Sequence, residues 1–440
     1  MGGVALLARS AGHRVTGCDQ GVYPPMSTQL REQGVEITEG YAAGQTRLAP
    51  DLYVIGNAIS RGNPLLERIL DQGLPYISGP QWLAENILAG RWVLGVAGTH
   101  GKTTTASMLA WILEYAGMSP SYLIGGVPEN FGVSARLTQS AFFVIEADEY
   151  DTAFCDKRSK FVHYRPRTLV LNNLEFDHAD IFADLAAIQT QFHHLIRTVP
   201  QIGGIVTNAG DDHLNQVLQR GLWSKRIDFN IPQGWHLQAE DHDGAFQVWN
   251  GARQIGQTRL ALSGRHNQLN ALAALLAARH VGVLPEHALA ALADFQGVKR
   301  RMEYKGIVDG VSVYDDFAHH PTAIQATLEG ARQRFSSGRL LAVFEPRSNT
   351  MKLGTMKSAL PRSLALADRA YCYTRDLGWD AAEVFAPCAE KMVLSEQLDA
   401  LVAAVTREAR PGDHILVMSN GGFGGIHQRL LDALSQRDTA

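Results

Sequence analysis

Residues 98–104 have the composition and spacing of a loop that binds phosphate groups. The segment Gly-Thr-His-Gly-Lys-Thr-Thr follows a short apolar run at 92–97 and precedes apolar residues at helical spacing. These flanks predict a buried parallel strand and a helix. Glycines in the turn let backbone N–H groups close on an anion, Lys102 adds a point charge, and Thr103 offers a hydroxyl group to magnesium. The segment is therefore predicted to bind the phosphates of ATP.

The spacing of this loop departs from the strict G-x-x-x-x-G-K-[ST] pattern. The residue five before Gly101 is Val96, and the nearest glycines are Gly95 and Gly98. A glycine-rich turn with a chance lysine is the alternative interpretation. The order of strand, loop and helix favours the phosphate site.

Carboxylates follow the next apolar run, at 142–146. The segment continues from Glu146 through Asp148, Glu149 and Asp151. Acids at the carboxyl end of a parallel strand lie where ligands bind, and beside a phosphate loop they can hold magnesium. The alternative is a solvated strand end, but the run is apolar enough to be a central strand.

Two further segments carry candidate ligands. A buried strand at 169–171 leads into Asp177 and His178, and we favour a metal contact over a structural role for this histidine. Asn267 and Asn270 lie three apart near the start of an alanine-rich helix, and so share one face. Capping of that helix and contact with a ligand remain equal alternatives for the asparagines.

Strands and helices alternate along the rest of the chain, including a helix expected at 182–197. Length alone suggests about three domains. We place them at 1–90, 91–296 and 297–440. In the last one, strand ends near Asp316, Arg347 and a glycine-rich turn at 421–425 mark one sheet edge as a ligand face.

The first domain has an unusual beginning. A helix at Met1 is followed by a strand that ends at Asp19, which is the second half of a Rossmann-type unit. The opening strand of such a unit is missing, so we expect either an upstream start or a domain without the usual glycine loop. A nucleotide-linked ligand is expected here, with an accessory domain that binds nothing as the alternative.

Bulk composition is that of a cytoplasmic protein. Apolar residues make up 45% and charged residues 19%, and no apolar run approaches a membrane span. The four scattered cysteines fit reduced thiols, and a net charge of −4 does not support a nucleic-acid partner. The sequence carries no signal of oligomeric state.

Together, five motifs resemble the three-domain Mur ligases, ATP-dependent amide-bond synthetases of peptidoglycan assembly. The resemblance covers essentially the whole chain, and the motifs occur in order at 98–104, 146–151, 172–178, 264–270 and 315–321. It implies an α/β fold with a Rossmann-like N-terminal domain, a central domain with the parallel sheet of P-loop ATPases, and a Rossmann-like C-terminal domain.

The resemblance also implies roles for individual residues. Thr103, Glu146 and His178 would hold magnesium. Asn267 and Asn270 would lie near adenine, and Arg301 and Asp316 would contact the phosphates and the ribose. The triphosphate would be bound by Gly98, Thr99, His100, Gly101, Lys102, Thr103 and Thr104, and the catalytic set would be Lys102, Glu146, His178 and Arg301.

Within the family, residues 149–164 and 344–354 resemble the branch that joins UDP-N-acetylmuramate to the murein tripeptide L-alanyl-γ-D-glutamyl-meso-diaminopimelate during peptidoglycan recycling. Arg347 is predicted to hold the distal carboxylate of that peptide, with ATP contact or solvent exposure as alternatives. Rival functions are addition of L-alanine alone, a folate-type glutamate ligase, and a nucleotide-gated binding module without ligase activity.

Two features depart from the family pattern. Several Mur ligases use a carbamylated lysine to hold a second magnesium ion, but no lysine occurs between Lys160 and Lys225, and Phe192 falls near that position. The missing first strand removes the glycine-rich loop that would hold the uridine diphosphate.

Overall fold

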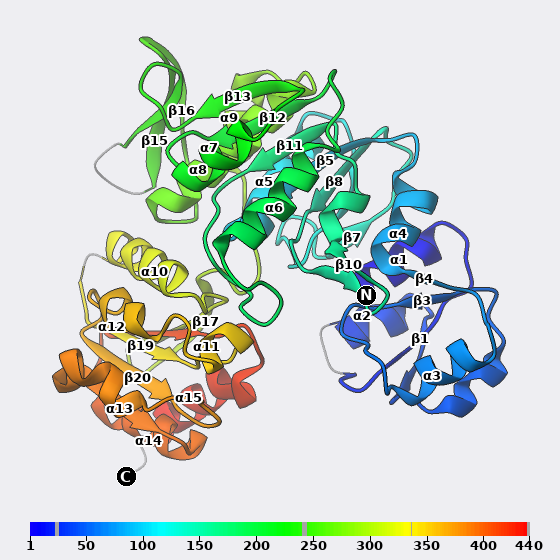
Figure 1. Cartoon of the computed structure of the whole chain (residues 1–440). Coiled ribbons are helices and arrows are strands. Elements are labelled where there is room, and N and C mark those ends of the chain that lie inside the picture. Colours follow the sequence, from blue (N-terminus) through cyan, green and yellow to red (C-terminus); the bar gives the residue numbers. More distant parts are fainter. Residues whose placement is uncertain (23–25, 240–243, 336, 438–440) are drawn as a thin grey trace.

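The computed structural model describes residues 1–22, 26–239, 244–335 and 337–437, which form three units along the chain (Figure 1). The N-terminal unit runs from α1 to α4, the central unit from β5 to α9, and the C-terminal unit from β17 to α15. Each unit is built on its own β-sheet or sheets, so the predicted mixed α/β architecture is confirmed. No helix in these described ranges has the length and apolar character needed to cross a membrane.

Two small parallel sheets form the N-terminal unit. Its first element is a helix and its second a strand, as predicted. The strands are β1 (Thr16–Asp19) with β2 (Glu36–Glu39), and β3 (Tyr53–Ile55) with β4 (Tyr76–Ser78). The helices are α1 (Gly2–Ser10), α2 (Met26–Glu32), α3 (Pro64–Asp71) and α4 (Gly79–Leu83). Helices α1 and α4 bury Leu7 and Trp82 in a core shared with the central unit.

A ten-stranded sheet forms the central unit. Its order is β16-β15-β14-β13-β12-β11-β5-β8-β6-β7, and all its strands run in one direction except β7 and β15. The strands that frame the site are β5 (Trp92–Ala97), β8 (Phe142–Glu146) and β11 (Thr168–Leu171). The others are β6 (Ser121–Leu123), β7 (Ala135–Arg136), β12 (Gly204–Asn208), β13 (Lys225–Phe229), β14 (Trp235–Ala239), β15 (Ala245–Asn250) and β16 (Arg253–Arg259).

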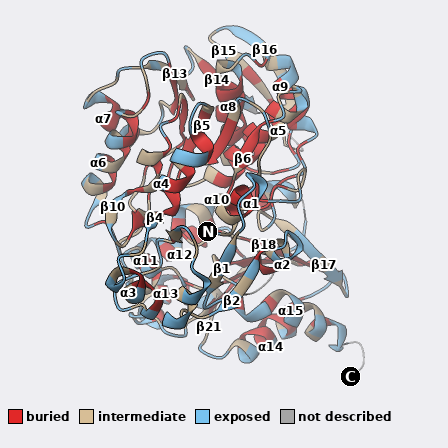
Figure 2. Ribbon diagram, turned by 90° about the vertical axis from the view of Figure 1, so that its right-hand side faces the viewer, coloured by how far each residue is buried: buried red, intermediate tan, exposed pale blue. Residues whose placement is uncertain are grey.

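Helices cover both faces of this sheet, which explains why its central strands are apolar throughout (Figure 2). One face is covered by α5 (Lys102–Tyr115), α8 (Arg265–His280) and α9 (Pro285–Ala293). The other is covered by α6 (Leu185–Ile196), α7 (Asp212–Gln219), α1 and α4. The helix expected at 182–197 begins later, at Leu185, because the Asp184 carboxylate caps it by accepting from the Ala187 N–H at 2.8 Å.

The C-terminal unit has a six-stranded sheet of order β17-β18-β22-β19-β20-β21, with β17 antiparallel to the rest. The strands are β17 (Glu303–Val308), β18 (Val311–Asp316), β19 (Leu340–Phe344), β20 (Arg369–Tyr373), β21 (Met392–Ser395) and β22 (His414–Met418). Helices α10 (Pro321–Arg334), α12 (Leu360–Ser363) and α13 (Ala381–Phe385) pack on one face, and α14 (Leu398–Glu408) and α15 (Ile426–Ser435) on the other. The helices that follow the neighbouring strands β19 and β22 therefore pack on opposite faces of the sheet. Ligands bind at such switch points.

Candidate active site

The phosphate loop turns between β5 and α5 in the middle of the central sheet, as predicted. Gly101 ends the turn with a φ of 77°, and a Cβ atom there would lie 2.5 Å from Oδ1 of Asn270. Only glycine combines this left-handed conformation with such a close neighbour. The first N–H groups of α5 have no partner within the helix, which makes them donors for an anion.

The segment after β11 holds this loop in shape. Asn173 accepts from the His100 N–H at 2.8 Å, and its amide donates to the His100 carbonyl at 3.1 Å. The Thr99 hydroxyl accepts from the Glu175 N–H at 2.9 Å. Two motifs that are separate in the sequence therefore form one rigid surface.

A cluster of buried charges surrounds Lys102. Its Nζ lies 2.7 Å from Oε2 of Glu149 and 3.7 Å from Oδ1 of Asp148. Burial alone would lower the pKa of Lys102, but the two carboxylates outweigh it and raise the pKa above its usual range. The lysine therefore stays charged. Glu149 and Asp148 were identified only as members of an acidic segment, and their pairing with Lys102 depends on the sheet order.

Thr103 and Glu146 form the predicted pair of oxygen ligands. The Thr103 hydroxyl donates to Oε1 of Glu146 at 2.8 Å, and the Gly125 N–H donates to Oε2 at 2.6 Å. Burial raises the pKa of Glu146 and outweighs the Gly125 N–H, the Lys102 charge and the Thr103 hydroxyl, all of which lower it. A hydroxyl and a half-buried carboxylate fit a magnesium ion.

His178 lies with a different set of acids. Its Nε2 is 3.2 Å from Oε1 of Glu149, and the ring of Tyr150 packs on it at 4.1 Å between centroids. Donor atoms of Asp148, Glu149 and His178 lie within 4.8 Å of one another, as ligands of one ion would. The predicted metal ligands thus fall into two groups, Thr103 with Glu146 and His178 with Glu149, and a metal contact of His178 stays a prediction.

The position expected for a carbamylated lysine is part of the core. Phe192 is fully buried in α6 and packs edge-on against Phe161 at 5.4 Å. A phenylalanine has no amine that could form a carbamate, and its apolar ring holds no ion.

The two asparagines of α8 do not cap the helix, which begins after Gly264 without a side-chain cap. Asn267 donates to the Ser263 carbonyl at 2.7 Å. Asn270 lies under the phosphate loop and accepts from Asn172 at 3.2 Å. Capping is therefore excluded for both, and contact with adenine stays a prediction.

Arg301 lies in the link between the central and C-terminal units, and Asp316 is the last residue of β18. Asp316 is 4% exposed, and its carboxylate accepts from the N–H groups of Met302 and Ala318 at 2.9 and 2.8 Å. The Arg301 guanidinium lies 5.1 Å from the ring of Phe317. These contacts brace the turn after β18, while the expected contacts with ribose and phosphate stay predictions.

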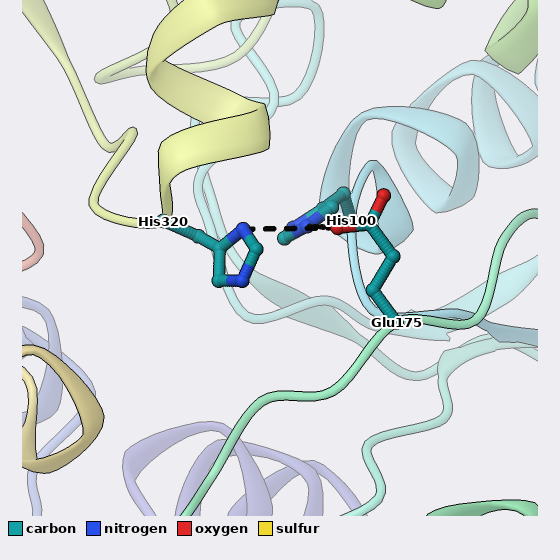
Figure 3. A group of neighbouring side chains, drawn as sticks. All are labelled: His100, Glu175 and His320. Carbon is teal, nitrogen blue, oxygen red and sulfur yellow. Dashed lines mark ion pairs between the residues drawn. The ribbon is translucent and has the colours of Figure 1, made fainter. Parts of the chain in front are cut away.

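Glu175 joins the phosphate loop to the C-terminal unit (Figure 3). Its Oε2 lies 3.5 Å from Nε2 of His100 and 3.8 Å from Nδ1 of His320, and it accepts from the Thr322 hydroxyl at 2.7 Å. Burial alone would raise the pKa of Glu175, but these partners outweigh it and lower the pKa to about 2. Sequence reasoning noted all three motifs without foreseeing that they meet.

The switch point of the C-terminal sheet holds Arg347. This exposed arginine follows β19, and a Cβ atom on Gly421 after β22 would lie 1.4 Å from its Nη1. The guanidinium therefore lies directly over the glycine-rich turn. The same unit has a cavity of about 360 Å³, whose lining includes Glu345, Tyr373 and Arg375.

Comparison with known proteins places this geometry in a family. Profiles described as "Mur ligase family, catalytic domain", "Mur ligase middle domain" and "Mur ligase, glutamate ligase domain" match residues 1–91, 96–278 and 300–421. The UDP-N-acetylmuramate–L-alanyl-γ-D-glutamyl-meso-2,6-diaminoheptandioate ligase of Escherichia coli is 54% identical over 100% of this chain and 97% of its own length. The same ligase of Haemophilus influenzae is 50% identical over 99% and 96%.

Solved structures agree with these matches. A murein peptide ligase from Psychrobacter arcticus aligns with a TM-score of 0.78 and 46% identity, covering 99% of this chain and 96% of that one. The UDP-N-acetylmuramate-alanine ligase of Thermotoga maritima aligns with a TM-score of 0.80 at 21% identity, over 100% and 97%. The second match shows the shared three-domain fold alone.

Acid should destabilise the folded protein by protonating His320, one of the three residues in Figure 3. Burial, followed by the charge of His100, lowers the pKa of His320 to about 4, below the ~6.5 of an unfolded histidine. The unfolded chain therefore binds the proton more readily, so stability is full above about pH 6.5 and is lost as the pH falls toward 4. Between pH 7 and pH 5 this should cost about 1–2 kcal/mol, or roughly 2–4 °C in melting temperature.

Thermal melts at the two pH values test this expectation. His320→Asn, which keeps a capping oxygen for α10, should show a smaller drop in melting temperature than the parent. The same change at the exposed His287 serves as the control. Equal drops in melting temperature in all three proteins would show that His320 is not the group whose protonation destabilises the fold.

Proposed function

The chain belongs to the Mur ligase family, and on that premise we propose that it joins UDP-N-acetylmuramate to L-alanyl-γ-D-glutamyl-meso-diaminopimelate in peptidoglycan recycling. The observation that carries the proposal is the full-length similarity to two ligases whose names state these substrates, at 54% and 50% identity. Ligases named for L-alanine match at 29–36%. The chain is therefore an ATP-dependent ligase that forms an amide bond.

We assign one substrate to each domain. Residues 1–90 would bind the nucleotide sugar, 91–296 ATP, and 297–440 the peptide. The phosphate loop lies in the second of these ranges, and Arg347, over the glycine-rich turn, lies in the third. Because the reaction consumes ATP and a nucleotide sugar, the cytoplasm is the proposed compartment.

Amide formation requires activation of a carboxylate, since its oxygen is a poor leaving group. In the proposed path, an oxygen of the lactyl carboxylate attacks the γ-phosphorus of ATP, and the bond from phosphorus to the ADP oxygen breaks. The alanine amine of the peptide then attacks the acyl carbon. The carbon–oxygen bond to phosphate breaks, phosphate leaves with the electron pair, and the nitrogen loses a proton.

The residues around the loop supply charge and orientation for these steps. Lys102, kept charged by Glu149 and Asp148, contacts the transferring phosphoryl group, and Arg301 offsets charge on the phosphates. Thr103, Glu146 and His178 would hold magnesium, which supplies neutralisation of the triphosphate. Positioning and electrostatics account for most of the catalysis of phosphoryl transfer.

Phosphate release tests the proposed function. The parent protein, given ATP, magnesium and UDP-N-acetylmuramate, should release phosphate rapidly only when the tripeptide is added, and mass spectrometry should detect the joined product. Faster turnover with L-alanine would identify the alanine ligase. Phosphate release at the same rate with and without an amine substrate, with no joined product, would indicate a nucleotide-gated module.

Arg347→Lys should show whether Arg347 contacts the peptide or ATP. A fork of two parallel hydrogen bonds becomes a point charge, so the KM for the tripeptide should rise about tenfold, equivalent to ~1.4 kcal/mol. The KM for ATP should stay constant. Arg362→Lys, at an exposed arginine of the same unit, is the control. A rise in the KM for ATP would assign Arg347 to the nucleotide instead.

A further inference from the structure

A second lysine, Lys160, pairs with the same carboxylate, Asp148, as Lys102 does. The Nζ of Lys160 is 2.9 Å from Oδ2 of Asp148, and the Nζ of Lys102 is 3.7 Å from Oδ1 of the same side chain. Asp148 therefore bridges two ammonium groups. The mechanism above uses only one of them.

A hairpin fixes the position of Lys160. Strands β9 (Asp151–Ala153) and β10 (Asp156–Ser159) pair antiparallel and return the chain to the acidic segment. At the base, the Ser159 hydroxyl donates to the Glu149 carbonyl at 2.5 Å, and the Lys160 N–H donates to the Tyr150 carbonyl at 2.8 Å. The hairpin thus ties Lys160 to the backbone of the residues that neutralise Lys102.

The side chain of Lys160 also contacts an aromatic ring. Its Nζ lies 5.3 Å from the centre of the Tyr150 ring, whose centroid is 4.1 Å from that of the His178 ring. A cation at this distance from an aromatic ring is attracted to it. Lys160 therefore belongs to the same ordered cluster as the candidate metal ligands.

The hairpin borders the N-terminal unit. Phe154, at its tip, packs on Tyr76 with 5.7 Å between ring centroids, and α4 packs against both β9 and the 3₁₀ helix Lys160–His163. Lys160 therefore lies between the phosphate loop and the proposed nucleotide-sugar domain.

The two lysines differ in how many acceptors they have. Lys102 donates to Glu149 at 2.7 Å and to the Thr99 carbonyl at 3.4 Å, while Asp148 lies farther away at 3.7 Å, so one of its three donors remains for the phosphoryl group. Among the described residues, Lys160 donates from its side chain to Asp148 alone, and that side chain is 21% exposed. It keeps donors for another anion.

We propose that Lys160 binds the lactyl carboxylate of UDP-N-acetylmuramate beside the γ-phosphoryl group held by Lys102. This inference rests on the proposed function and adds a residue that contacts the reacting carboxylate. A carboxylate and a triphosphate repel each other, and an ammonium group between them offsets that repulsion. After the new phosphorus–oxygen bond forms and the bond to ADP breaks, the same ammonium faces the acyl phosphate.

Calorimetry with two nucleotide sugars tests the proposal. UDP-N-acetylglucosamine shares the nucleotide and sugar of UDP-N-acetylmuramate but lacks the lactyl carboxylate. Lys160→Met should weaken the binding of UDP-N-acetylmuramate at least about tenfold. The affinities for UDP-N-acetylglucosamine and ADP should change less than about twofold. Lys160→Arg should recover part of the loss. Lys157→Met is the matched control, because this side chain of the same hairpin is 71% exposed.

Three results would overturn the proposal. In Lys160→Met, these are an equal loss of affinity for both nucleotide sugars, a parallel loss of affinity for ADP, and an unchanged affinity for UDP-N-acetylmuramate. A parent protein that binds UDP-N-acetylmuramate without ligating it would defeat the proposed function, while the comparison of the two sugars would still decide the role of Lys160. A parent that binds neither sugar would overturn both.

Discussion

The buried charge of Lys102 is the constraint on which the rest of the site depends. An ammonium group in the interior costs several kcal/mol unless it is paired and hydrogen-bonded. Glu149 and Asp148 meet this need, and they can do so only because β8 lies beside β5 with Glu146 opposite Val96. The sheet register thus brings the acids that follow β8 to the lysine that follows β5. A site prepared in this way requires little rearrangement when phosphates arrive.

Other contacts secure this arrangement from outside. The segment after β11, the other neighbour of β5, fixes the phosphate loop through Asn173 and extends Glu175 toward the C-terminal unit. The hairpin of β9 and β10 fixes the acids from the side of the N-terminal unit. Three neighbouring strand ends therefore connect the loop to both outer units. This connection is what an enzyme needs if it must bring three substrates together at one reaction centre.

Local pattern was enough to predict most elements and several contacts. The strand, loop and helix around Lys102 are encoded by adjacent residues. Thr103 meets Glu146 because β5, which leads to Thr103, runs parallel to β8, which ends at Glu146. Contacts between distant segments were not predictable, since they depend on strand order and on how the units pack. Glu175 with His320, Lys160 with Asp148, and Arg347 over Gly421 are of this kind. The later start of α6 was predictable from the capping residue Asp184.

Isotope transfer tests the central claim that the Lys102 cluster is built to phosphorylate a carboxylate. UDP-N-acetylmuramate labelled with ¹⁸O in its lactyl carboxylate would be turned over with ATP and the tripeptide, and the phosphate would be analysed by mass spectrometry. The account predicts one labelled oxygen in each phosphate released, because the oxygen that attacks phosphorus leaves with it. Phosphate without label, formed while the amide product accumulates, would show that the carboxylate oxygen never bonded to phosphorus.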